Sequence, residues 1–202
     1  MLKKKKGAVE TVMVAESLPE GKAYENEEPH VKVIAFLTHE CVWAEDKADA
    51  RSLYDQSRFG EPKDGKIVYA LVEALYLLEK GKMQVLFGKK PLSVDQFMRR
   101  AQRVEPNFLV RYAAFKDMRS RGYIVKTALK FGADFRVYDR GVKPGDDHAR
   151  WIMYPVHEGS TFSWYEFSAK NRVAHSTRKR LLLAIVDSEL DCTFYEIAWK
   201  RP

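Results

Sequence analysis

The chain has 202 residues, of which 46% are hydrophobic and 31% charged, a composition typical of one large or two small globular domains. The net charge of +7 is uneven. Residues 1–106 hold 18 basic and 17 acidic side chains (net +1), and residues 107–202 hold 17 and 11 (net +6). Because clustered lysines and arginines attract phosphates, we expect a surface that faces a polyanion on the C-terminal side.

The sequence favours a soluble intracellular protein. Its two cysteines, Cys41 and Cys192, form no CxxC pair and have no histidine at zinc-site spacing, so we expect small buried residues and no metal site. The N-terminal lysine run is not followed by a signal-peptide apolar stretch. The longest apolar region, IVYALVEALYLLEK, is interrupted by Glu73 and is too short to span a bilayer.

The pattern along the chain predicts a mobile N-terminal extension at residues 1–30, which are polar and rich in glutamate. An α+β unit is expected over residues 31–106. Its predicted elements are strands at 31–38 and 83–88, helices at 46–60, 67–79 and 91–104, and a loop at 61–66.

Pro106 is the predicted domain boundary, because the helical pattern restarts at Phe108 and the charge balance changes there. Residues 107–202 carry a helix followed by strand-like runs, a short helix near 168–178 and two final strands. The predicted fold class is α/β (α+β). It consists of two small domains, a mixed N-terminal one and a C-terminal one whose central mixed sheet is flanked by helices.

Three residues in the second domain are candidates for chemistry. Alternation along FGADFRVYDRG places Tyr138 beside Arg136 on the polar face of a strand. His148 lies where a Gly- and Pro-rich loop enters the next strand, and Lys179 lies at a helix–strand junction. On the expected helix, Arg172, His175 and Lys179 would share one face. Spacing alone favours a surface tyrosine and an incidental histidine, and it explains the lysine equally well as part of a solvated basic face.

A tyrosine, a histidine and a lysine that meet in space suit RNA cleavage without a metal ion, in which the 2′-hydroxyl attacks the adjacent phosphate. That reaction needs a base, an acid for the 5′-leaving oxygen, and a cation beside the phosphate oxygens. Spacing does not show that the three residues meet.

The segments VRYAAFKDMRSRGYIVKTALKFGADFRVYDRG, DDHARW and RVAHSTRKRLLLAIVD resemble the archaeal tRNA-splicing endonucleases, or tRNA-intron lyases. VYALVEALYLLEKGKMQV resembles the N-terminal domain of that family, so the resemblance covers roughly residues 31–202. It departs from the family pattern at Ala128, where glycine is usual, and at Ala149, where serine often follows the histidine.

The resemblance implies that residues 107–202 form a catalytic nuclease domain. Tyr138 would be its general base, His148 its general acid and Lys179 its transition-state stabiliser, with a 2′,3′-cyclic phosphate and a 5′-hydroxyl as products and no cofactor. Tyrosine ordinarily titrates near 10, so a base role calls for nearby cations. Arg172 matches one of the arginines that grip an unpaired base in the family. For the second, only Lys200 and Arg201 are nearby candidates.

The family's substrate is the bulge-helix-bulge of precursor tRNA, which requires two active sites at a fixed separation. The resemblance therefore implies paired subunits, as a homotetramer or a heterotetramer with a non-catalytic structural paralogue. Asp146 and Asp147 match the acidic loop that docks between subunits. Tyr195 and Trp199, on one face of the last strand, are further interface candidates. Lys47 is a candidate RNA contact, although a solvated lysine explains it as well.

Two alternatives stay open. The first alternative to a catalytic tRNA-splicing endonuclease is a non-catalytic structural or RNA-binding subunit of the same assembly, and the second is a metal-dependent nuclease of another class. Retention of all three candidate catalytic residues argues against the first, and the lack of an obvious carboxylate–lysine cluster in the sequence argues against the second.

Overall fold

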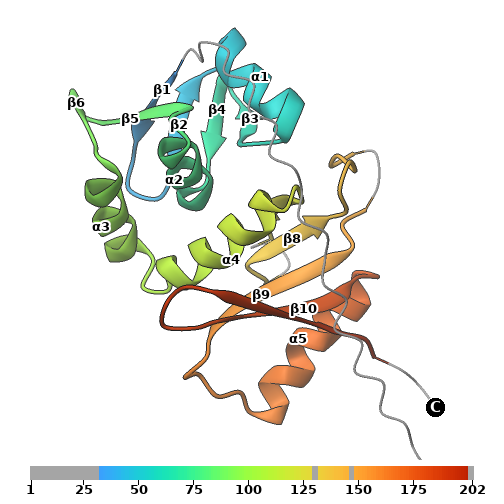
Figure 1. Ribbon diagram of the computed structural model, residues 1–202. Coiled ribbons are helices and arrows are strands. Elements are labelled where there is room, and N and C mark those ends of the chain that lie inside the picture. Colours follow the sequence, from blue (N-terminus) through green and yellow to red (C-terminus); the bar gives the residue numbers. More distant parts are fainter. Residues whose placement is uncertain (1–31, 129–131, 146–147, 200–202) are drawn as a thin grey trace, which may run out of the picture.

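The computed structural model describes residues 32–128, 132–145 and 148–199, and they form two small mixed domains. Each domain is built on one sheet, with the N-terminal sheet above the C-terminal one in Figure 1. The mixed α/β class and the two-domain architecture predicted from the sequence are confirmed. The exact division at Pro106 remains our proposal. The predicted extension at 1–30 lies outside the described residues.

The N-terminal domain holds a six-stranded sheet in the order β3-β4-β2-β1-β5-β6, in which only β1 and β5 pair in parallel. Three helices accompany it (Figure 1). The elements are β1 (Val33–Leu37), β2 (Val42–Glu45), α1 (Ala48–Ser57), β3 (Glu61–Lys63), β4 (Lys66–Tyr69), α2 (Leu71–Glu79), β5 (Met83–Phe87), β6 (Lys90–Pro91) and α3 (Val94–Val104).

The C-terminal domain holds a five-stranded sheet in the order β11-β10-β9-β8-β7, in which only β9 and β10 pair in parallel. One helix, α4, packs on one face, and α5 packs on the other. The elements are α4 (Phe108–Ser120), β7 (Ile124–Thr127), β8 (Phe135–Tyr138), β9 (Trp151–His157), α5 (Trp164–Ser176), β10 (Arg180–Val186) and β11 (Cys192–Ile197).

Helix α4 joins the two domains into one continuous core. Its buried side chains Phe108, Tyr112, Phe115 and Met118 share a single apolar cluster with α2, with α3 and with one face of the C-terminal sheet. The opposite face of that sheet packs a second cluster under α5. The C-terminal domain is therefore a three-layer α/β/α unit, which fixes the ends of β8, β9 and β10 relative to one another.

A buried ion pair also links the domains. The ammonium Nζ of Lys126 on β7 donates to Oε1 of Glu73 on α2 at 2.9 Å and to the carbonyl of Gly60 at 2.9 Å, and both charged side chains are about 95% buried (5% and 4% exposed). Glu73 also accepts from the backbone N–H groups of Gly60 and Ala70. Nearby, Arg119 of α4 donates to the Ser57 carbonyl. Because the charges of Lys126 and Glu73 are paired and hydrogen-bonded, this link fixes one domain against the other.

The structure corrects the sequence prediction in the N-terminal domain. Residues 61–66, expected to be a loop, form the β3–β4 hairpin, whose turn residues Asp64 and Gly65 both have positive φ (49° and 73°). The predicted helix at 67–79 begins only at Leu71, because residues 66–69 are strand β4. Asp-Gly is a strong signal for a tight hairpin, so this element was readable from the sequence. Strand β2 was not predicted at all.

In the C-terminal domain the predicted strands are confirmed, but α5 begins earlier than expected, at Trp164. Ser163 caps it: its Oγ accepts from the Glu166 N–H, and the Glu166 carboxylate accepts from the Ser163 N–H. The backbone N–H and the hydroxyl of Ser163 both donate to the Glu166 carboxylate, and these two hydrogen bonds lower its pKa. The two cysteines are partly buried and unpaired with each other, rather than fully buried as expected. No helix in the described ranges has the length and apolar character needed to cross a membrane.

Candidate active site

The three candidate catalytic residues lie at one end of three neighbouring strands. Tyr138 ends β8, His148 lies in the segment that leads into β9, and Lys179 directly precedes β10. Strand β8 runs antiparallel to β9, and β10 runs parallel to β9, so the end of the first and the starts of the other two meet at the same edge.

The register places Tyr138 and Lys179 in one row across the sheet. Trp151 of β9 pairs with Val137 on one side and Arg180 on the other. The ladder continues outward, because the N–H of Arg150 donates to the Val137 carbonyl and the Arg150 carbonyl accepts from the Arg180 N–H. The next row therefore holds Tyr138, Arg150 and Lys179. The backbones of Tyr138 and Lys179 are about 10 Å apart in this row, because they are separated by two strand spacings.

Alternation puts the candidate side chains on one face. Val137 packs toward α4, so Tyr138 and Arg136 point to the α5 side, as does Ile152, which pairs with Arg136. Lys179 has the same parity as Leu181, which lies under α5. His148 has the same parity as Ile152 but precedes the regular strand. A phenol, an imidazole and an ammonium thus lie at one end of the three inner strands β8, β9 and β10, a place that we call the site corner.

Tyr138 is more buried than the sequence suggested. Its residue is 5% exposed and packs with Ile124, Ala149 and Val142, so the interpretation as a surface tyrosine is wrong. Burial raises the pKa of the Tyr138 phenol above its ordinary value, while the positive charge of Arg136 partly opposes this shift. In the RNA-free protein the phenol is therefore mainly protonated at neutral pH.

Lys179 lies at the predicted junction but not on the helix. Helix α5 ends at Ser176, and Arg178 adopts a left-handed conformation (φ 56°) that turns the chain into β10. The expectation that Lys179 continues the face of Arg172 and His175 is therefore wrong. Its ammonium donates to the Thr177 carbonyl at 2.8 Å. Partial burial, and secondarily the charge of Arg136, lowers its pKa.

Arg136 is close enough to act electrostatically on both Tyr138 and Lys179. Its guanidinium carbon is 6.0 Å from the centre of the Tyr138 ring, and its charge acts on both Tyr138 and Lys179. A guanidinium nitrogen lies 3.7 Å from a carboxylate oxygen of Glu61 on β3, so the N-terminal domain reaches this corner. Sequence reasoning missed Glu61 because it assigned residues 61–66 to a loop of another domain.

His148 is exposed to solvent just before β9, next to buried Ala149, as expected for a histidine where a loop enters a strand. Beside an ammonium and a guanidinium, a phenol and an imidazole can exchange protons with a bound molecule while the cations stabilise negative charge on it. Within the described ranges, no group of three His, Cys, Asp or Glu side chains is placed to hold a metal ion.

Arg172, the candidate base-gripping residue, is exposed on α5, one helical turn before His175. The His175 ring contacts the Trp199 ring edge-on, with centroids 4.4 Å apart. Trp199 comes just after β11 and is 46% exposed. An arginine and two flat rings thus gather on this side of α5, which the sequence alone did not indicate. Lys200 and Arg201 lie outside the described residues.

The other candidates are spread over the surface. Tyr195 is 56% exposed on β11, which is an edge strand of the sheet as expected. Lys47 lies at the start of α1 in the N-terminal domain, where its ammonium is 2.5 Å from a Glu45 carboxylate oxygen. Asp146 and Asp147 fall outside the described residues.

In comparison with known proteins, both domains match models of the same protein family. Residues 108–194 match the family model described as tRNA intron endonuclease, catalytic C-terminal domain, and residues 33–98 match its N-terminal domain. The N-terminal match runs from the start of β1 into α3, and the C-terminal match runs from the start of α4 into β11. The interval between them contains Pro106, which is consistent with the division that we propose.

Curated proteins named tRNA-splicing endonuclease are similar over most of their length. The protein of Thermococcus gammatolerans is 38% identical over 169 residues, which is 84% of this chain and 99% of that protein. That of Methanothermobacter thermautotrophicus is 36% identical over 172 residues, 85% and 100% of the two chains. That of Nanoarchaeum equitans is 49% identical over 138 residues, 65% and 88% of the two chains.

Proposed function

The chain belongs to the tRNA intron endonuclease family, and from that membership we propose that it is a catalytic member, which cuts precursor tRNA at the borders of an intron. The observation that supports the catalytic assignment is that Tyr138, His148 and Lys179 lie at neighbouring ends of β8, β9 and β10 in the C-terminal sheet. A purely structural subunit has no need of an acid–base set at such a corner.

In the proposed mechanism, the 2′-oxygen of the RNA attacks the adjacent phosphorus. Tyr138 accepts the 2′-hydroxyl proton, and His148 gives a proton to the departing 5′-oxygen. The bond from phosphorus to the 2′-oxygen forms as the bond to the 5′-oxygen breaks, which leaves a 2′,3′-cyclic phosphate and a 5′-hydroxyl. Lys179 supplies positive charge beside the phosphate oxygens as negative charge builds up on them.

The burial of Tyr138 has a kinetic consequence. Because its pKa lies above the ordinary range, only a small phenolate fraction exists near neutrality in the RNA-free protein. Arg136 increases that fraction, since its charge favours the phenolate over the phenol. We therefore assign Arg136 a positioning role, and its contact with Glu61 makes β3 part of the support for the site.

The proposed RNA grip lies on α5. Arg172 offers a planar guanidinium on the same side as Trp199, which suits an unpaired base held by stacking and cation–π contacts. We further propose that Tyr195 and the edge of β11 pair with another subunit, as a homotetramer or a heterotetramer with a non-catalytic paralogue, with Asp146 and Asp147 docking between subunits. Lys47 is retained as a proposed RNA contact.

Single-turnover cleavage of an intron-containing tRNA tests the assignment. Tyr138→Phe, His148→Ala and Lys179→Ala should each slow cleavage by about two or more decades, the scale of an acid–base group. The matched control is His157→Ala, at the other end of β9, where the ring accepts a hydrogen bond from the backbone N–H of nearby Gly159. Equal rates for the control and the three variants would contradict the proposal. Cleavage that needs a second polypeptide would favour the heterotetramer.

A further inference from the structure

A basic surface occurs in the domain whose total charge is nearly balanced. The β5–β6 hairpin and α3 together carry Lys89, Lys90, Arg99, Arg100 and Arg103, and residues 86–104 contain only one carboxylate, that of Asp95. None of the five cations forms an ion pair with a carboxylate among the described residues, and all but partly buried Arg100 are exposed. This local charge was hidden in the sequence by the acidic residues elsewhere in the N-terminal half.

The surface is shaped by the way α3 packs. Phe97 and Ala101 turn to the core, while the arginines lie on the outer side of the helix. The Arg100 guanidinium carbon lies 4.0 Å from the centre of the Phe87 ring, at the end of β5. A hollow of about 440 Å³ lies beside this contact and is also lined by Lys90, Arg99 and Arg103. Cations from the helix and the hairpin therefore face the same space.

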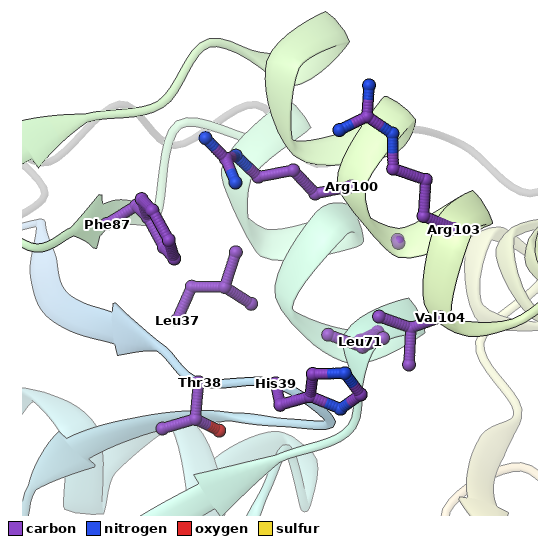
Figure 2. A pocket seen from close by; sticks show the side chains of 9 residues that line it. Leu37, Thr38, His39, Leu71, Phe87, Arg100, Arg103 and Val104 are labelled. Atoms are coloured by element: carbon purple, nitrogen blue, oxygen red, sulfur yellow. The ribbon is translucent and has the colours of Figure 1, made fainter.

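An apolar cavity of about 260 Å³ adjoins the hollow, and Figure 2 shows its walls. Leu37 and Leu71 lie deep in it, Phe87 stands on one side, and Arg100 and Arg103 extend from α3 along the rim. Phe87 is 46% exposed although it is a large apolar residue. The cavity is slightly smaller than typical small-molecule sites, and it suits one flat ring rather than a larger ligand.

We propose that α3 and the β5–β6 hairpin form an accessory RNA-binding surface, in which Arg99, Arg103 and Lys90 contact phosphates and Phe87 stacks an unpaired base of the precursor. Both parts of a nucleotide find a partner here: cations for the phosphate, and an exposed aromatic ring beside an apolar cavity for the base. An acidic protein segment would use the cations but leave the ring and cavity unexplained. The inference rests on the proposed function, since that function supplies the RNA.

The test is equilibrium binding of fluorescently labelled precursor tRNA with 2′-deoxy nucleotides at the cleavage sites, which prevents cutting. The double variant Arg99→Gln/Arg103→Gln should weaken binding about tenfold near 0.1 M KCl. The slope of log Kd against log [KCl] should fall by about 1.5, because two phosphate contacts are lost at 0.7–0.9 each. Phe87→Leu keeps an apolar side chain but removes the ring, and should weaken binding about fivefold or more without changing the slope.

The matched control is Lys66→Gln/Lys82→Gln, which removes two exposed cations of the same domain, one at the start of β4 and one just before β5, and should bind as the wild type does. Circular dichroism and native mass are measured for every variant. An Arg99/Arg103 double variant with wild-type Kd and slope would overturn the proposal. So would a fall in native mass with an unchanged slope, which would assign the surface to contact with a protein.

The two proposals fail separately. If the wild-type chain binds the RNA with a salt slope that the double variant reduces, yet cuts no precursor, then the accessory surface stands and the proposed function falls. If the wild type cuts the precursor but the slope is unchanged in the double variant, then the function stands and the surface falls.

Discussion

The buried pair between Lys126 and Glu73 gives the sharpest test of how the two domains are held together. Lys126→Met keeps most of the unbranched apolar stem but removes the ammonium, which donates to the Glu73 carboxylate and to the carbonyls of Gly60 and Arg58. Removing one partner of a buried ion pair generally costs about 3–5 kcal/mol. Glu73 retains two backbone N–H donors, at 3.0 and 3.3 Å, so we expect the lower end, about 3 kcal/mol.

A loss of that size lowers Tm by about 6–12 °C, because 1 kcal/mol corresponds to about 2–4 °C in a chain of this length. The assay is urea unfolding followed by circular dichroism and tryptophan fluorescence, with Tm measured in parallel. Coinciding transitions would establish that both domains unfold together. The double variant Glu73→Gln/Lys126→Met should lose less stability than the sum of the single changes, because it leaves no unpaired buried charge.

Lys116→Met is the matched control, because Lys116 forms an exposed ion pair with Glu79, with nitrogen and oxygen 2.7 Å apart. Exposed pairs contribute at most about 1 kcal/mol, so this variant should remain close to the wild type. If Lys126→Met also stays within about 1 kcal/mol of the wild type, the reasoning from burial is refuted.

Three further outcomes follow from the site and the hairpin beside it. In His148→Ala, the cleavage rate should rise about tenfold per pH unit through the neutral range, because only the phenolate fraction of Tyr138 then changes with pH. A substrate with a 5′-sulfur leaving group, which needs no general acid, should restore the rate of this variant. A pH-independent rate would contradict a tyrosine base. In Arg136→Gln, the pKa values of Tyr138 and Lys179 should both rise, so cleavage should slow near neutrality and its pH profile should move to the alkaline side. Arg136→Lys keeps the positive charge and should restore much of the profile. A uniform loss of rate at every pH would indicate a merely structural role for Arg136. Gly60→Ala should lower the free energy of unfolding by about 2–3 kcal/mol. Gly60 has a φ of +70°, and an added Cβ would lie 2.5 Å from the Ile67 side chain on β4. An unchanged urea midpoint would refute this.

The C-terminal domain was the more predictable half. Its strands are either continuous apolar runs, such as LLLAIVD, or alternating segments, such as FRVY. Its helix α4 shows a clear apolar repeat beginning at Phe108, so period and length indicated each element. The N-terminal domain was harder to predict because β3 and β6 are very short and exposed. Only the Asp64-Gly65 turn marks the β3–β4 hairpin, and edge strands of this kind lack the buried alternation that periodicity detects.

The candidate site, too, was predictable from the sequence only in part. Residue type and family resemblance pointed to Tyr138, His148 and Lys179, but only the register of β8, β9 and β10 brings them to one corner. The contact of Arg136 with Glu61 was not predictable, since the two residues lie 75 positions apart (136 minus 61) on different domains. The burial of Tyr138 likewise depends on β7 and on the loop that follows β8, which no local pattern reveals.

End-group analysis tests the central claim most directly. An intron-containing precursor tRNA is incubated with this chain alone in excess EDTA, and the ends of the released exons and intron are identified. The proposed chemistry predicts cleavage at both intron borders, with a 2′,3′-cyclic phosphate on one side of each cut and a 5′-hydroxyl on the other. Cleavage that is abolished by EDTA, or that leaves a 5′-phosphate and a 3′-hydroxyl, would contradict it.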